Sequence, residues 1–481
     1  MKNKKSFVLN VLYNFLYNGL NIAFPLLTAP YVSRVLGPNN LGQVNFANIV
    51  VNWFILFACF GIPYYGIREV AKRKGDKAAL SKIFSELFTI NLLFTTGTIV
   101  IYFLSIFLVP KFNQELGLFL IFGGIIFLNI FSIDWFFQGM EQYQFITVRS
   151  LIIKTFSLIC IFLLLRNPDD YLIYASIIVV SLSFGNILNF LYSRKLVVLS
   201  FMEMNLKRHF RSLFIFFVTA LVVNVYTNVD QLLLGFLSGA VAVAFTNRSR
   251  LVINTVASLS NSIINVALPR TSYYLENDNE AYKSFINIIP RILMIVTFAI
   301  SSFIFVMSDQ IIFLLGGQDF IPAGIILKIL SVVIIFSQFS TFLQYQIMVP
   351  KGFEKLGLMC SILASIVSLL VNFILIPRYG YVGAAVASVA AEFVSLASRM
   401  FVVYRLEVGI SNILDSSFLK VLAASLISGG IVFVVVQNFH MNVFISLFLN
   451  SLLFFGIYVT CLIILKESIF SSTIKNFRRK R

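Results

Sequence analysis

Long apolar stretches alternate along the chain with short polar or basic segments. Reading each window of about 20 apolar residues as one membrane-spanning helix predicts fourteen helices. Their centres are expected near residues 19, 52, 96, 128, 157, 182, 224, 254, 303, 335, 367, 392, 428 and 453. No connection between them exceeds about 20 residues, which leaves no room for an extramembrane catalytic domain. The pattern therefore predicts an all-α polytopic membrane protein.

Polar residues recur at helical spacing inside several of these apolar stretches. Around residue 254 the steps between polar positions are 3, 4, 4, 3 and 4, which places them on one helical face. These residues are Asn247, Arg250, Asn254, Ser258, Asn261 and Asn265. Similar stripes are Asn10, Asn14, Asn18 and Asn21; Asn45, Asn48 and Asn52; and Asn224, Asn228 and Gln231. Such faces indicate a polar cavity within the membrane, although asparagines also hydrogen-bond between packed helices.

A weak internal repeat relates the two halves of the chain. Leu36-Gly37, Gly42, Phe46 and Asn48 correspond to Leu234-Gly235, Gly239, Phe245 and Asn247, and Gly139-Met140-Glu141-Gln142 corresponds to Gly352-Phe353-Glu354-Lys355. The offset of about 200 residues predicts two pseudo-symmetric six-helix lobes, residues 1–212 and 213–412. Residues 413–481 would add two more transmembrane helices and a basic cytoplasmic tail.

Composition and charge support a membrane protein and suggest its orientation. Hydrophobic residues make up 59% of the chain and charged residues only 12%, and the mean hydropathy is +0.92, which excludes an ordinary soluble domain. The basic residues concentrate in the segments that are cytoplasmic if both termini are cytoplasmic. The net charge of +17 then reflects orientation and attraction to lipid headgroups, so no nucleic-acid partner is expected.

Cysteine and histidine provide no pattern for a metal site or a disulfide framework. The four cysteines lie singly in separate apolar stretches. The two histidines, His209 and His440, fall in predicted loops, where we expect them to be solvated. We therefore expect no metal and no cofactor.

Charged residues inside the predicted spans indicate what the cavity binds. Arg248 and Arg250 lie near the middle of their helix, and a guanidinium matches phosphate oxygens in geometry and charge. We expect them to bind an anionic substrate; the alternative is structural pairing with Asp230 or Glu392. Lys154 would either line the N-terminal half of the cavity or reach the membrane interface.

Three acidic residues in or near the spans are candidates for ion coupling. Asp134, Asp230 and Glu392 could each carry a proton or coordinate sodium, because burial in a membrane raises the pKa of a carboxyl group. The alternative is an ion pair, for example between Glu392 and Arg399.

Several ordered motifs resemble the Wzx type of polysaccharide biosynthesis protein, which comprises lipid-linked oligosaccharide flippases of the multidrug/oligosaccharidyl-lipid/polysaccharide superfamily. The motifs are Pro30–Pro38 with Gly42, Gly61 and Arg68; Asp134–Glu141; Asp230–Gly235; and Pro377–Ala385. The resemblance extends over nearly the whole chain and implies two lobes around a cationic cavity. It also implies alternating access that moves an undecaprenyl-pyrophosphate-linked repeat unit across a bacterial plasma membrane, in association with polysaccharide polymerase machinery.

Two other functions fit parts of the pattern. A multidrug extruder of the same superfamily would share the fold but should favour acidic and aromatic pocket residues, against which the paired arginines argue. A membrane glycan polymerase would need a large outer loop or interfacial carboxylates, and the sequence has no clear example of either.

Overall fold

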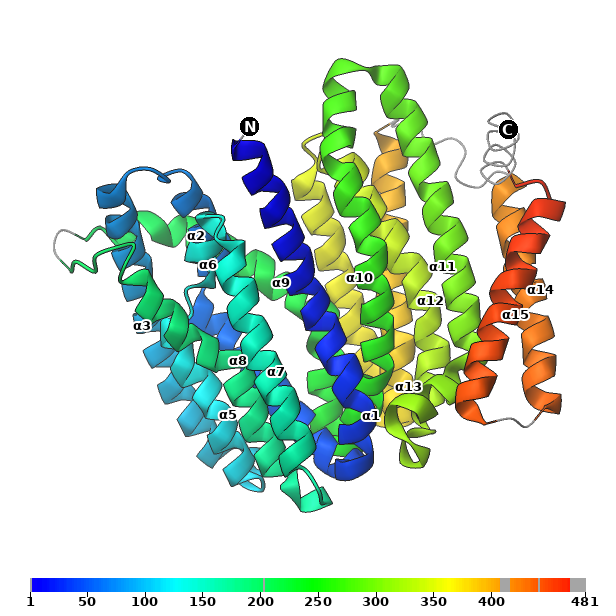
Figure 1. Ribbon diagram of the computed structural model, residues 1–481, viewed down its shortest axis with the longest axis horizontal. Helices are drawn as coiled ribbons and strands as arrows, with labels where there is room; N and C mark the ends of the chain where they lie inside the picture. The colour runs from blue at the N-terminus through cyan, green and yellow to red at the C-terminus, as the bar shows by residue number, and fades with distance from the viewer. Residues whose placement is uncertain (1, 202–203, 407–415, 440–441, 468–481) are drawn as a thin grey trace. The chain divides into compact units, whose positions relative to one another are not determined.

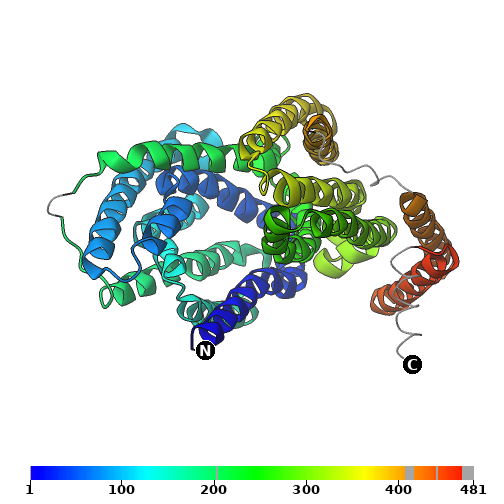
Figure 2. The ribbon, with the colours of Figure 1, turned by 90° about the horizontal axis from the view of Figure 1, so that it is seen from above.

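The computed structural model describes residues 2–201, 204–406, 416–439 and 442–467. Within these ranges the regular structure is entirely helical (Figures 1 and 2). The α-helices are α1 (Lys2–Cys59), α2 (Ile62–Ala71), α3 (Lys77–Leu108), α4 (Pro110–Asn113), α5 (Leu116–Leu128), α6 (Asp134–Gly139), α7 (Tyr143–Leu164), α8 (Tyr171–Ser193), α9 (Lys207–Leu237), α10 (Ala240–Asn277), α11 (Asn279–Gly316), α12 (Ala323–Phe342), α13 (Glu354–Arg405), α14 (Ser416–Asn438) and α15 (Val443–Ile464). Short 3₁₀ turns occur at Asn129–Phe131, Pro168–Asp170 and Gln318–Phe320, and a π-helical segment at Leu343–Met348.

The predicted membrane helices are confirmed. In the described part of the chain, ten helices are long and apolar enough to cross a membrane. Two of them, α1 and α13, each consist of two helices joined at a glycine with non-helical backbone, Gly37 (φ 69°) and Gly380 (φ 55°). The other two predicted centres, near residues 128 and 254, fall in the shorter apolar helix α5 and in α10. The chain is a multi-pass membrane protein.

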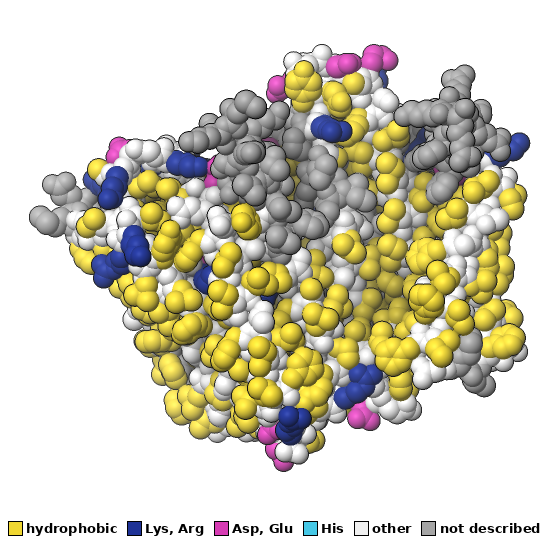
Figure 3. All heavy atoms as spheres, in the orientation of Figure 1, with side chains coloured by type: hydrophobic (Ala, Val, Ile, Leu, Met, Phe, Trp, Pro, Cys, Tyr) yellow, Lys and Arg dark blue, Asp and Glu magenta, His cyan; other side chains and the backbone are white. Residues whose placement is uncertain are grey.

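Hydrophobic side chains dominate the flanks of the helices. On the face drawn in Figure 3 they cover the middle of the helices, whereas most charged side chains gather toward the helix ends. Large apolar side chains such as Leu108, Ile152 and Leu426 are exposed on the helices. Their exposure to water would be unfavourable, but it suits helices that are surrounded by lipid. The four cysteines are all free.

The chain packs as two compact units, residues 1–244 and 245–481. The first holds α1 to α9 and the start of α10, because α9 packs against α1 and α2. The second holds the rest of α10 and α11 to α15, with α14 and α15 side by side and both packed on α11 (Figures 1 and 2). The lobe boundary at residue 212, which comes from the sequence repeat, stays a prediction.

Glycines explain the close helix contacts in the first unit. A Cβ added to Gly42 of α1 would overlap the carbonyl of Ala240, and one added to Gly235 of α9 would overlap the ring of Phe46. Lys111 donates hydrogen bonds to the carbonyls of Gly235 and Phe236, the last carbonyls of α9, where a cation is favourable. The part of α1 around Gly42 and Phe46 and the C-terminal end of α9 therefore belong to one packed region.

The aromatic motif on α6 packs into the core of the same unit. Trp135, Phe136 and Phe137 are all buried, and α6 lies on α2. A Cβ on Gly66 of α2 would come within 2.5 Å of the Trp135 ring, so only glycine permits this approach.

Helix α2 is amphipathic, with Ile62, Tyr65 and Val70 buried and Tyr64 and Arg68 exposed. Its carboxylate Glu69 is contacted by Arg68 at 3.2 Å, Lys72 at 3.3 Å and Arg73 at 2.6 Å. Burial alone would raise the pKa of Glu69, but the hydrogen bonds from Arg73 and Lys72 hold the pKa below its usual value.

The expectation for His209 is wrong. Helix α9 begins at Lys207, so His209 lies in its first turn and is only 1% exposed. Its Nε2 lies 2.9 Å from Glu86 Oε2, and its Nδ1 lies 2.7 Å from the Tyr65 hydroxyl. Glu86 is fully buried and also accepts hydrogen bonds from Arg208 and the Asn205 amide. This network joins α2, α3 and α9; His440 lies outside the described residues.

We predict that Gly42→Ala destabilises the folded protein, because the new methyl group would meet the Ala240 backbone, which cannot move aside cheaply. Gly97→Ala is the matched control, since its Cβ meets nothing within 4 Å and alanine favours a helix by about 1 kcal/mol. Thermal unfolding in detergent should show a lower midpoint for Gly42→Ala and an equal or higher one for Gly97→Ala. Equal midpoints for the two variants would contradict the packing role.

Candidate functional site

In the first unit, a lysine lies on a polar, partly exposed face between α1 and α7. Lys154 of α7 donates a hydrogen bond to Asn21 Oδ1 of α1, and its Nζ lies 5.9 Å from the centre of the Phe24 ring. Asn21 is exposed and Lys154 is half-buried. Among the described residues, no carboxylate lies within ion-pair distance of Lys154. An exposed amide and ammonium on membrane helices favour a water-filled surface over lipid.

The asparagine stripes in this unit form hydrogen bonds along their own helices. Asn52 donates to Asn48 Oδ1 at 3.4 Å, and Asn228 donates to Asn224 Oδ1 at 3.2 Å. Asn52 is exposed and Asn45 and Asn48 are half-buried. The side chains of Asn14 and Asn18 lie outside the described set.

In the second unit, Arg248 and Arg250 point to different sides of helix α10, although the sequence predicts that both bind the substrate. Arg250 is half-buried, and its Nη2 donates to the Ser388 hydroxyl at 3.1 Å. Arg248 is buried, with 5% exposure. Residues two apart on a helix point about 200° away from each other, so the two side chains lie in different environments. Of the stripe around Arg250, Asn254 is exposed and Asn247 and Asn261 are half-buried.

Asp134, one of the three acidic candidates, takes part in a polar cluster. Its Oδ1 accepts hydrogen bonds from Arg149 Nη1 at 3.1 Å and from Asn189 Nδ2. We call Asp134, Arg149 and Asn189 the first polar cluster. It supports a structural ion pair at Asp134, with a partner that the sequence analysis did not consider.

The other two acids lie on membrane helices. Asp230 of α9 is 3% exposed, and Glu392 of α13 is half-buried. Arg399, the suggested partner of Glu392, donates to neutral groups, namely Gln344 Oε1 at 3.2 Å and the hydroxyls of Ser340 and Ser361 at 2.8 Å. We call Gln344, Ser361 and Arg399 the second polar cluster.

Solved structures with this fold are membrane transporters. The chain superimposes on the lipid II flippase MurJ in its inward closed conformation with a TM-score of 0.75 and 18% identity, over 96% of this chain and 100% of MurJ. An inward-facing multidrug resistance MATE family transporter of the MOP superfamily gives a TM-score of 0.60 and 15% identity, over 82% of this chain and 96% of that one. These similarities define the fold as that of polytopic transporters.

Residues 7–275 match the polysaccharide biosynthesis protein family, and the chain belongs to this family. A putative O-antigen transporter of Escherichia coli strain K12 is 27% identical over 168 residues, 35% of this chain and 40% of that protein. A putative O-antigen transporter of Shigella dysenteriae is 26% identical over 161 residues, 34% of this chain and 40% of that protein. The matched segment thus spans about two fifths of these relatives. The resemblance read from the motifs is confirmed.

We predict that Asp134→Ala strongly destabilises the protein, because Arg149, whose side chain is 9% exposed, would lose its carboxylate partner. Breaking a buried ion pair costs about 3–5 kcal/mol of folding free energy. Because the Asp134 side chain is 30% exposed, the expected loss is about 3 kcal/mol or less. Glu141→Ala is the control, since its pair with Lys74 is exposed and worth about 0–1 kcal/mol. Chemical unfolding in detergent should separate the two variants, and equal losses would contradict the assignment.

Proposed function

We propose that the chain is a flippase that moves undecaprenyl-pyrophosphate-linked oligosaccharide repeat units from the inner to the outer leaflet of a bacterial plasma membrane. A charged sugar–pyrophosphate head cannot cross about 30 Å of hydrocarbon unaided. The protein would supply a polar path by alternating access while the lipid tail stays in the bilayer. The proposed activity breaks no covalent bond, so we assign no catalytic residue.

The proposal rests mainly on the position of Lys154 on a polar, partly exposed helix face. A half-buried ammonium on a membrane helix, held by a neutral amide, is suited to an anionic ligand such as a phosphate group. In the second unit, Arg250 supplies a guanidinium on the amide-rich face of α10. Arg248 would act indirectly, because it is buried. The neighbouring asparagines, including Asn45, Asn48, Asn247, Asn254 and Asn261, would contact sugar hydroxyls, as would Asn14 and Asn18 of α1.

The proposal also covers the ion that drives transport, the orientation of the protein in the membrane and the protein that receives the glycan. Glu392, Asp230 or Asp134 would couple transport to a proton or sodium gradient, because a carboxylate on a membrane helix can carry a proton or coordinate sodium. Both termini would lie in the cytoplasm, as the distribution of basic residues predicts. The glycan would pass to a polysaccharide polymerase on the outer side.

The alternative with the same fold is a multidrug extruder that exports cations. The MATE transporters share the helical arrangement, so the fold does not decide between the two functions. An ammonium on the polar face would repel a cationic drug, which favours the anionic cargo. A glycan polymerase fits less well, since the described connections between the membrane helices are short.

We predict that depletion of the protein in its native host traps lipid-linked repeat units on the cytoplasmic leaflet. Leaflet position can be measured by the accessibility of the sugars to an added lectin or glycosidase in intact and opened spheroplasts. Re-expression should restore outer exposure. Normal outer exposure with unpolymerised units after depletion would overturn the flippase and favour a polymerase.

We predict that Lys154→Gln and Arg250→Gln each lower export about tenfold or more, because a lost charge-assisted hydrogen bond costs about 1.5–3 kcal/mol. Lys154→Arg should keep most of the export, since it preserves the charge. Lys82→Gln, an exposed lysine near the start of α3, is the matched control. Export would be measured by surface polysaccharide at equal protein levels in the membrane. Unchanged export in both glutamine variants would show that Lys154 and Arg250 do not bind the substrate.

A further inference from the structure

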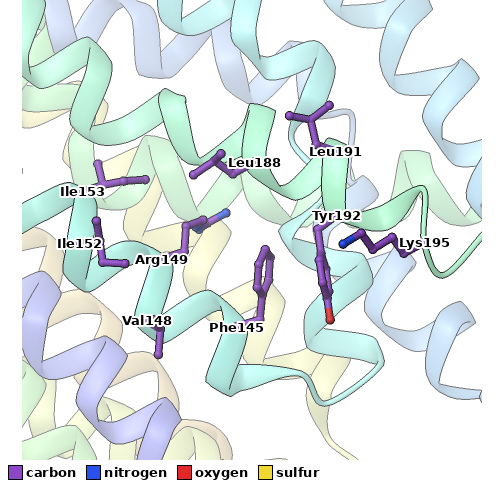
Figure 4. Close-up of a pocket in the computed structure, with 9 residues that line it drawn as sticks. All are labelled: Phe145, Val148, Arg149, Ile152, Ile153, Leu188, Leu191, Tyr192 and Lys195. Carbon is purple, nitrogen blue, oxygen red and sulfur yellow. The ribbon is translucent and has the colours of Figure 1, made fainter.

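A pocket of about 440 Å³ lies between α7 and α8, on the side where α8 ends (Figure 4). Its lining is almost entirely apolar and includes Val148 and Ile152 of α7 and Leu188 and Leu191 of α8. Val148, Ile152 and Leu191 are exposed. An open apolar pocket on membrane helices is solvated by lipid chains, so its natural ligands are amphipathic lipids.

One end of the pocket has the chemistry of a membrane interface. Lys195 follows the last turn of α8, and its Nζ lies 6.0 Å from the centre of the Tyr192 ring. Tyr192 stacks on Phe145 of α7 with ring centres 4.3 Å apart. Aromatic rings and snorkelling lysines mark the level of the lipid headgroups. The exposed ammonium therefore places a positive charge where a lipid phosphate would lie.

A buried arginine supplies a second polar group deeper in the pocket. Arg149 lies one helical turn, about 6 Å, beyond Phe145. Its side chain is 9% exposed, and Nη1 is engaged by Asp134 and by the Gly185 carbonyl at 3.0 Å. Its Nε–H has no hydrogen-bond acceptor among the described residues. A Cβ on Gly185 would come within 3.0 Å of the guanidinium carbon, so glycine leaves room for this side chain.

A buried N–H group without an acceptor is costly and points to a missing partner. Because Arg149 lines the pocket, we infer that this partner is an oxygen of a ligand that enters the pocket from the lipid side. A glycerophospholipid carries such an oxygen in its ester carbonyls, just below the phosphate. A polyprenyl phosphate has only hydrocarbon at that level.

We propose that this pocket binds an anionic glycerophospholipid. Lys195 pairs with the phosphate, an ester carbonyl accepts from Arg149 Nε–H, and an acyl chain lies along Val148, Ile152 and Leu188. A zwitterionic lipid carries a cation beside its phosphate, which weakens the attraction to Lys195. This site is separate from the proposed transport cations and does not depend on the transported cargo.

The test uses the full-length protein, delipidated in detergent and titrated by native mass spectrometry. Phosphatidylglycerol should bind more tightly than phosphatidylcholine with the same acyl chains. Lys195→Gln should weaken phosphatidylglycerol binding about tenfold, and Val148→Trp should block the pocket. The matched controls are Lys207→Gln, at an exposed lysine, and Leu164→Trp, at an exposed apolar position of α7 outside the pocket; both should bind like the unmodified protein.

The role of Arg149 is tested by changing the lipid and not the protein, so that the ion pair between Arg149 and Asp134 stays intact. Ether-linked phosphatidylglycerol lacks the ester carbonyls and should bind several-fold more weakly than the ester-linked lipid. Equal affinity of the two lipids would overturn the Arg149 contact. Equal binding of phosphatidylcholine, or no difference between the pocket variants and their controls, would overturn the site. Full displacement by equimolar undecaprenyl phosphate would reassign the pocket to a prenyl lipid.

Discussion

Hydrocarbon offers no hydrogen-bond partner, and this constraint organises the polar residues of the chain. Arg399 shows how completely a buried charge is satisfied, because its guanidinium donates to Gln344, Ser340, Ser361 and Ser395. Asn91, likewise buried, donates to the carbonyls of Asn129 and Ile130. Against this background the half-buried Lys154 is unusual, since its ammonium is held by one amide on an exposed face. Function is best sought where a polar group is not enclosed by the protein.

The two polar clusters support the internal repeat at the level of side-chain chemistry. Asp134 and Gln344 are 210 residues apart, and so are Asn189 and Arg399. In each unit an acceptor in the segment before the fifth predicted helix accepts a hydrogen bond from the sixth. The position of the arginine differs between the units. Arg149 lies on the fifth predicted helix of the first unit, whereas Arg399 lies on the sixth predicted helix of the second. Each unit therefore keeps the same three-way contact, with the charge moved to another helix.

Hydropathy predicts the ten membrane helices found in the described part of the chain, because the length of an apolar stretch is a local property of the sequence. Partners across helices are not local, so the sequence alone indicates neither the pair between Arg149 and Asp134 nor the neutral partners of Arg399. Periodicity did place Arg250 on the polar face, but it could not show that Arg248, two residues earlier, is buried. His209 was misread because the start of α9 was placed too late. The positions of Lys154 and Asn21 on neighbouring helices required the fold.

The motifs that carry the family resemblance are largely packing devices. Gly42 and Gly235 permit close helix approach, Gly380 permits the bend in α13, and Trp135 fills the core against Gly66. Such residues stabilise the fold, which MurJ and the MATE transporters share with this chain. The choice of cargo must then depend on residues outside the motifs, where the sign of the charge on the polar faces differs between transporters of anions and of cations. For this chain we propose Lys154 and Arg250 for that role, and both are positively charged.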